Sequence, residues 1–238
     1  MEYTKLLLIR FQNSLLSHEI EQFRGAVISN LKDKDILFHN HLPEGEGFRY
    51  GYPLIQYKRI NRKAAILCIG IGTEAIGKLF SDIDMELKLN DREVKFLIDN
   101  VKAYQQRIQI WESKFNYHIR KWLALNQENY EKYNGLEGLG EKILFLENIL
   151  KGNILSFAKG LNIFLDKQVE CTITQLSEPS LTRYKGVKMT MFDAEFTTNV
   201  SIPDYVGLGK GVSLGYGTTV KAINKNNNKT ATKTIPLQ

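Results

Sequence analysis

The sequence is poor in several residue types: its 238 residues include two cysteines, five prolines and four histidines. Cys68 and Cys171 are far apart and lie in apolar stretches. They therefore predict buried thiols in a reducing cytoplasm and exclude a disulfide framework or a cysteine zinc site. No apolar run is long enough to span a bilayer, and the N-terminal run ends early, at Arg10, unlike a signal peptide. We expect a cytoplasmic protein with no membrane partner.

Two common phosphate-binding loops are also missing. A Walker loop ends in Gly-Lys followed by Ser or Thr, whereas Gly209 and Lys210 are followed by Gly211. A dinucleotide-binding loop needs a third glycine three residues after the second, and Val212 occupies that position after Gly209. These departures predict no nucleotide cofactor, but they leave RNA or DNA open as a ligand.

The composition is that of a globular protein with a moderate basic excess. Hydrophobic residues make up 43% of the chain, and 32 Lys and Arg against 26 Asp and Glu give a formal net charge of +6. The positive charge permits nucleic-acid binding without requiring it, since many basic proteins bind none.

A glycine-rich stretch near the C-terminus is the most distinctive motif. Its five glycines are Gly207, Gly209, Gly211, Gly215 and Gly217. Glycine permits close backbone approach to a ligand, and successive N–H groups of such a loop can bind an anion. The motif therefore predicts contact with RNA phosphates, although a turn between two strands is the alternative.

The pattern of apolar residues predicts an α+β fold. The first half has the order β-α-β-β-α-β of a ferredoxin-like (RRM-like) domain. The second half follows this order less cleanly, and residues 107–122 fit a strand or a helix. The predicted strands are 3–11, 36–41, 54–60, 64–71, 85–89, 94–103, 169–175, 181–190, 191–200 and 218–223, and the predicted helices are 17–31, 73–82, 126–133 and 140–161.

These elements predict two domains, over residues 1–103 and 104–223, followed by a polar tail. We expect tandem ferredoxin-like domains with antiparallel sheets and helices on one face. The tail, residues 224–238, is rich in Asn, Lys and Thr and predicts disorder.

With these features the chain resembles the CRISPR-associated endoribonucleases of the sixth Cas family. The glycine-rich stretch before a short last strand, the run from His39-Asn40-His41 through residues 42–58, and the tandem halves carry the resemblance, which spans residues 1–223. It implies metal-independent cleavage of precursor CRISPR RNA within its repeats, in which the ribose 2′-OH attacks the phosphate to leave a 2′,3′-cyclic phosphate and a 5′-OH. It also implies a catalytic histidine near the connection between the first helix and the next strand, where His39 and His41 lie.

The residues themselves also point to His39 and His41. Positions i and i+2 of a strand face the same side, and an imidazole, with an unperturbed pKa of about 6.5, can accept or donate a proton near neutral pH. His41 is our first choice because it is nearer the following loop. We place Lys58 and Tyr50 beside them as catalytic groups. Two idle surface histidines, or a metal site completed by Glu44 or Glu46, are the alternatives.

The other two histidines predict no chemistry. We expect His18 on the surface and His118 in core or interface packing. The RNA-binding candidates are basic residues and the glycine-rich stretch, although a solvated face explains the basic residues equally well. They are Arg49, Arg59, Arg62, Lys185, Lys188, Gly207, Gly209, Lys210, Gly211, Gly215 and Gly217.

Three functions stay open on sequence alone. The first is a metal-independent endoribonuclease acting on CRISPR repeat RNA, with no cofactor. The second is a non-catalytic RNA-binding subunit of an RNA-guided complex, and the third is a metal-dependent hydrolase. Other CRISPR-associated proteins are expected partners, and a homodimer is left open.

Overall fold

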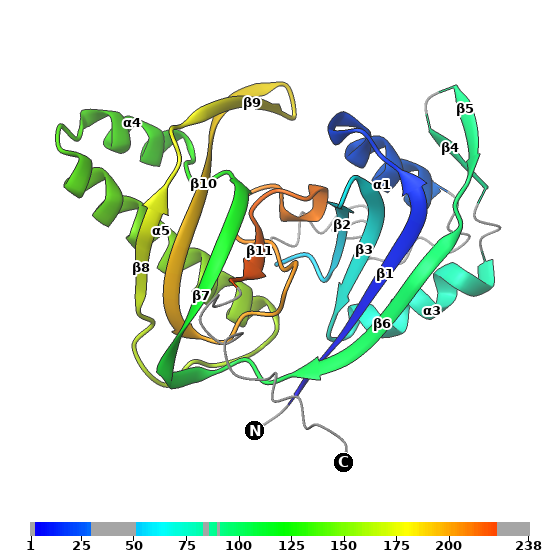
Figure 1. Ribbon diagram of the computed structural model, residues 1–238, viewed down its shortest axis with the longest axis horizontal. Coiled ribbons are helices and arrows are strands. Elements are labelled where there is room, and N and C mark those ends of the chain that lie inside the picture. The colour runs from blue at the N-terminus through cyan, green and yellow to red at the C-terminus, as the bar shows by residue number, and fades with distance from the viewer. Residues whose placement is uncertain (1–2, 30–50, 83–85, 90, 223–238) are drawn as a thin grey trace, which may run out of the picture.

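The computed structural model describes residues 3–29, 51–82, 86–89 and 91–222, which form two halves side by side (Figure 1). The first half contains a four-stranded antiparallel sheet in the order β2-β3-β1-β6. Its elements are β1 (Thr4–Ser14), the short 3-10 helix η1 (Ser17–Glu19), α1 (Ile20–Ser29), β2 (Ile55–Ile60), β3 (Lys63–Ile69), α3 (Gly72–Asp82), β4 (Glu86–Leu89), β5 (Arg92–Lys95) and β6 (Ile98–Gln106).

This sheet confirms the ferredoxin-like order predicted for the first half. The prediction of one strand over 94–103 was wrong, because the chain divides after Lys95. β5 pairs with β4 in a separate hairpin, and β6 pairs with β1 at the edge of the sheet. The strand predicted over 36–41 lies outside the described residues.

The alternation of apolar side chains along β1 builds two cores. Ile9 and Phe11 face the helices, where Phe23 of α1 packs edge-on against Phe11 at 5.8 Å between ring centroids. Leu6 and Leu8 face the other way and join a core that extends into the second half. A side-chain period of two thus places this sheet between its own helices and the rest of the protein.

The second half contains a sheet in the order β11-β7-β10-β8. Its main strands, numbered by their order in the chain, follow the 4-1-3-2 pattern that the first sheet also has. The elements are β7 (Ile110–Trp122), α4 (Gln127–Gly135), α5 (Leu139–Gly160), β8 (Cys171–Leu176), β9 (Ser180–Tyr184), β10 (Val187–Val200), the 3-10 helix η2 (Val212–Leu214) and β11 (Thr218–Lys221).

Three features of this half refine the sequence prediction. The ambiguous stretch 107–122 is mostly strand, with Tyr117 and Ile119 buried and His118 and Arg120 on the opposite face. The predicted break between residues 190 and 191 was wrong, since β10 is continuous and the turn lies at Lys185-Gly186. Residues 201–217, which include the glycine-rich stretch, occupy the place of the second ferredoxin-like helix.

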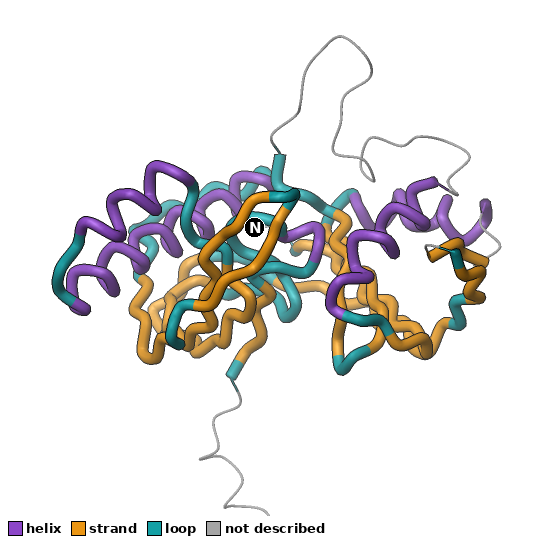
Figure 2. Tube along the Cα trace, turned by 90° about the horizontal axis from the view of Figure 1, so that it is seen from above, coloured by secondary structure: helices purple, strands orange, loops and turns teal. Residues whose placement is uncertain are grey.

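The helices gather on one side of the two sheets, as Figure 2 shows and as the sequence predicted. The helix α5 packs on its sheet through residues at helical spacing, of which Leu146, Leu150 and Ile154 are fully buried. Among the described helices, none is long and apolar enough to cross a membrane.

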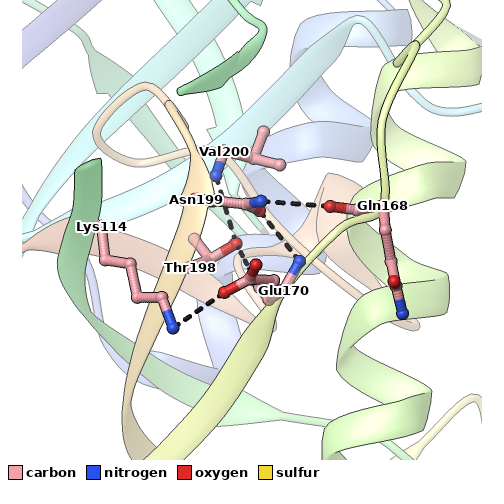
Figure 3. Close-up of polar contacts among 6 residues, drawn as sticks. All are labelled: Lys114, Gln168, Glu170, Thr198, Asn199 and Val200. Carbon is pink, nitrogen blue, oxygen red and sulfur yellow. Dashed lines mark hydrogen bonds and ion pairs between the residues drawn. The ribbon is translucent and has the colours of Figure 1, made fainter. Parts of the chain in front are cut away.

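Hydrogen bonds from buried polar side chains hold the segment that leads from α5 to β8 in place (Figure 3). The side chain of Asn199 accepts a hydrogen bond from the backbone of Glu170 at 2.9 Å and donates one to the carbonyl of Gln168 at 3.1 Å. The hydroxyl of Thr198 donates to the carbonyl of Glu170 at 2.7 Å. The end of β10 therefore holds the entry to β8, which stabilises the pairing of β8 with β10 at the end of this sheet.

Candidate functional site

The stretch from Gly207 to Gly217, called the glycine loop below, is held by side chains of the first half. The hydroxyl of Tyr52 donates to the carbonyl of Gly207 at 2.6 Å, and the Gly207 N–H donates to Oε1 of Gln56 at 3.0 Å. The Nε2 of Gln56 donates to the Tyr52 hydroxyl at 2.8 Å. Gln56 is fully buried and Tyr52 is partly buried, so this network crosses between the halves at a largely buried contact.

Lys58 completes this anchor of the glycine loop. Its Nζ donates to the carbonyl of Val212 at 3.2 Å and to the hydroxyl of Thr218 at 3.3 Å. The residue is 1% exposed, and burial lowers its pKa to about 7. We predicted a cation facing a phosphate at this position, but Lys58 points into the contact between the halves.

Each glycine of the loop has protein atoms where a side chain would begin. A Cβ at Gly217, where φ is +60°, would lie 1.8 Å from the carbonyl oxygen of Leu208, and a Cβ at Gly209 would lie 2.9 Å from Nε1 of Trp122. At Gly211, with φ of +69°, it would meet the rings of Tyr216 and Tyr184 at 2.9 and 3.0 Å. These contacts explain the glycines by packing within the protein; RNA contact by the loop stays a prediction. Lys210 is exposed.

A cavity of about 290 Å³ lies beside the glycine loop, and we call it the junction cavity. Four segments line it: the start of the first helical region, the end of β7, the β9–β10 hairpin and η2 with the residues that follow. Its basic and aromatic side chains are His18, Lys121, Arg183, Tyr184, Lys185 and Tyr216, and among the described residues its one acidic side chain is Glu21. Basic and aromatic groups thus converge from both halves.

Lys121 has an unusual backbone at this cavity. Its φ is +53°, in the left-handed region that favours glycine. The Lys121 N–H donates to Oδ1 of Asp193 at 2.7 Å, and its carbonyl accepts from Gly217 at 2.9 Å. Its Nζ reaches the Ser17 hydroxyl at 3.3 Å, and burial, followed by nearby Arg59, lowers the pKa of its amine. These contacts hold a strained lysine at the meeting point of the halves.

The basic residues predicted around β2 do not form one patch. Arg59 is half-buried, and its Nε donates to the carbonyl of Leu15 at 2.6 Å. Arg62 is exposed in the two-residue turn before β3 with φ of +67°, and Lys63 pairs with Asp99 at 3.5 Å. Arg49, Tyr50, His39 and His41 lie outside the described residues, as do the alternative metal ligands Glu44 and Glu46. Their roles stay predictions.

Two of the three basic residues predicted in the second half, Lys185 and Lys188, lie on the β9–β10 hairpin, whereas the third, Lys210, lies on the glycine loop. Lys185 occupies the turn of the β9–β10 hairpin, and Lys188 is paired directly across the hairpin from Arg183. Arg183, Lys185 and Lys188 are all exposed. The hairpin therefore presents a cluster of positive charge next to the junction cavity.

The two described histidines lie in different surroundings. His118 was predicted in core or interface packing, but it lies on the sheet face opposite Tyr117, with Nδ1 3.3 Å from Oε1 of Glu195. His18 is exposed, as predicted, yet it lines the junction cavity. No local pattern marks it, because its neighbours Tyr184 and Tyr216 come from the far end of the chain. Within the described residues, no three His, Cys, Asp or Glu side chains gather to hold a metal ion.

The two sheets with a shared core define a tandem ferredoxin-like protein. Comparison with known proteins specifies it further: the family model of the Cas6b N-terminal domain matches residues 2–107, and that of the Cas6b C-terminal domain matches residues 109–223. The chain belongs to the Cas6b family.

Two solved structures agree with this assignment, and the chain also resembles one curated protein. A crystal structure of Cas6b aligns with a TM-score of 0.84 at 28% identity, over 93% of this chain and 100% of the other. A structure described as the CRISPR RNA processing endoribonuclease Cas6b aligns with a TM-score of 0.72 at 26% identity, over the same shares of the two chains. An uncharacterized protein of Methanocaldococcus jannaschii is 34% identical over 137 residues, which are 57% of this chain and 92% of the relative.

Proposed function

We propose that the protein is an endoribonuclease that cleaves precursor CRISPR RNA within its repeats. The observation that carries the proposal is the match to both Cas6b domains over residues 2–107 and 109–223. A similar structure over its full length is described as a CRISPR RNA processing endoribonuclease. The proposed partners are CRISPR repeat RNA and other CRISPR-associated proteins in the cytoplasm, with a homodimer as an open alternative.

The charge of the β9–β10 hairpin supports an RNA substrate. Arg183 and Lys188 face each other as a cross-strand pair, and like charges directly opposite each other destabilise a hairpin. An RNA phosphate between or beside them neutralises that repulsion and releases counterions. Binding of a polyanionic partner therefore stabilises the hairpin by reducing this repulsion. We assign Lys185, Lys188 and the exposed Lys210 to phosphate contact.

In the proposed reaction the ribose 2′-OH attacks the adjacent phosphorus. The O–P bond to the 2′ oxygen forms as the bond to the 5′ oxygen of the next nucleotide breaks, which leaves a 2′,3′-cyclic phosphate and a 5′-OH. His41, with His39 as its partner, takes the proton from the 2′-OH and returns one to the leaving oxygen. Arg49 and Tyr50 stabilise the charge that develops on the phosphate. Lys58 serves this chemistry through the glycine loop, which it holds in place.

Cleavage of repeat RNA in excess EDTA tests the proposal. We expect cleavage at one position, a cyclic phosphate at the new 3′ end, and no cleavage of a substrate with 2′-deoxyribose at the scissile nucleotide. Cleavage of the deoxy substrate, or loss of activity in EDTA, would favour the metal-dependent hydrolase. Tight binding without cleavage would favour the non-catalytic RNA-binding subunit.

A further inference from the structure

We propose that the junction cavity binds one unpaired nucleotide of the repeat RNA, with the base against Tyr184 and Tyr216. This inference rests on the proposed function and specifies part of the substrate: a nucleotide that leaves the RNA stack and enters the space between the halves. It assigns a binding role to Tyr184, at which the sequence indicated none, and joins it to Tyr216 of the glycine loop.

The two tyrosines form an aromatic corner of the cavity. Their ring centroids are 5.6 Å apart, and the ring planes meet at 80°. Neither ring is fully buried, so a flat group can lie on one ring and touch the other with its edge. Burial raises the pKa of Tyr184, which keeps its phenol neutral beside a phosphate. Stacking of unpaired bases on aromatic rings is the main way proteins recognise single-stranded RNA.

The charged groups of the cavity suit the phosphates on either side of such a base. Lys121, Arg183 and Lys185 line the cavity against one carboxylate, Glu21. The Nζ of Lys185 lies 5.9 Å from the centre of the Tyr184 ring, so a cation stands next to the stacking surface. The side chains of His18 and Thr182 add groups that can hydrogen-bond to a base edge.

The size of the cavity limits the ligand to a single nucleotide. Its volume of about 290 Å³ lies near the lower end of the range for small-molecule sites, roughly 300–1,000 Å³. A duplex is too wide for a cavity of this volume. A double-stranded part of the RNA must therefore lie outside it, for example along the exposed cations of the β9–β10 hairpin.

A double-mutant cycle between RNA and protein tests the inference. Each nucleotide of the repeat is replaced in turn by an abasic residue, with 2′-deoxyribose at the scissile position to prevent cleavage, and the Kd is measured for the wild type and Tyr184→Leu. We expect one abasic position to weaken wild-type binding by about 5- to 150-fold, the scale of one stacked base. The same abasic position should have little effect on Tyr184→Leu.

Two further variants serve as controls. Tyr184→Phe keeps the ring and should keep the coupling to the same nucleotide. Tyr130→Leu removes a tyrosine that is 43% exposed on α4 and should show the wild-type pattern at every position. A melting temperature is measured for each variant, and if Tyr184→Leu does not fold, Tyr216→Leu takes its place in the cycle.

The outcomes separate this inference from the proposed function. If the wild type cleaves repeat RNA but abasic effects are equal in the wild type and Tyr184→Leu, the nucleotide site is wrong and the enzyme assignment stands. The same holds if no single abasic position matters. If the wild type neither binds nor cleaves repeat RNA, both proposals fail.

Discussion

The Nζ of Lys58 lies 3.2 Å from the carbonyl oxygen of Val212, across the contact between the two halves of the protein. A lysine that is 1% exposed normally destabilises a fold unless its charge is compensated. Here two oxygen acceptors receive its hydrogen bonds. The position of the glycine loop is therefore coupled to the protonation of one buried amine.

The first prediction follows from the pKa of Lys58. Burial lowers this pKa to about 7 in the folded protein, against about 10.4 in an unfolded chain. Between these pH values the unfolded chain binds more protons, so the free energy of unfolding rises with pH, by at most about 1.4 kcal/mol per pH unit. This contribution is fully present above about pH 10 and is lost as the pH falls toward 7.

Urea unfolding of the wild type and Lys58→Met between pH 6 and 9 measures the effect. Met fills a similar space without titrating. We expect the stability difference between the two proteins to shift in favour of the wild type as the pH rises above 7. Parallel stability curves would show that Lys58 titrates normally and is not held as described.

The second prediction concerns the glycines of the loop. Gly217 and Gly186 both have positive φ, +60° and +79°, but a Cβ at Gly217 would lie 1.8 Å from the carbonyl oxygen of Leu208, whereas one at Gly186 meets nothing within 4 Å. Gly186→Ala should therefore cost only the left-handed backbone, about 1–2 kcal/mol, and Gly217→Ala clearly more. Equal losses in thermal unfolding would contradict the packing explanation.

Gly211→Val extends this comparison to affinity. From the sequence we expect weaker RNA binding in a protein that stays folded. The contacts of Gly211 with Tyr184 and Tyr216 now add a loss of melting temperature, because a side chain must displace both rings. Unchanged affinity in the folded fraction would show that the loop only shapes the core of the second half.

Most of the helices and strands could be predicted from the sequence, because the spacing of apolar residues along the chain indicates them. Alternation in β1 and helical spacing in α5 are visible in the order of residues, and they were sufficient to locate these two elements. The hydrogen bonds that anchor the glycine loop could not be predicted in this way. Gln56 and Gly207 are 151 residues apart. No sequence pattern indicates that a glutamine in a strand will form a hydrogen bond with a buried backbone group so distant in the chain. The junction cavity is hidden for the same reason, since its tyrosines reach His18 only through the tertiary fold.

The third prediction concerns catalysis. His41→Ala should lower the cleavage rate by about 10²–10⁴-fold, the usual contribution of a general acid or base, and leave RNA affinity nearly unchanged. Single-turnover cleavage and filter binding measure the two quantities. His39→Ala and His18→Ala are made in parallel, because His39 is the proposed partner and His18 lines the junction cavity. Wild-type cleavage by His41→Ala, with loss in one of the others, would transfer the role to that histidine.

The last prediction separates the folding and binding roles of the β9–β10 hairpin. Lys188 faces Arg183 across the strands, so Lys188→Gln removes a repulsive pair and should leave the melting temperature equal or slightly higher. If Lys188 contacts a phosphate, the same change weakens RNA binding and reduces the slope of log K against log salt by about 0.7–0.9. Lys210→Ala should reduce the slope by a similar amount, since Lys210 is exposed on the glycine loop. Lys159→Gln, at an exposed position near the end of α5, is the matched control and should leave the slope unchanged.

A gain or no change in stability together with a loss of affinity is the combination that a purely structural role cannot produce. An unaltered salt slope in both Lys188→Gln and Lys210→Ala would remove the hairpin and the loop from the RNA interface.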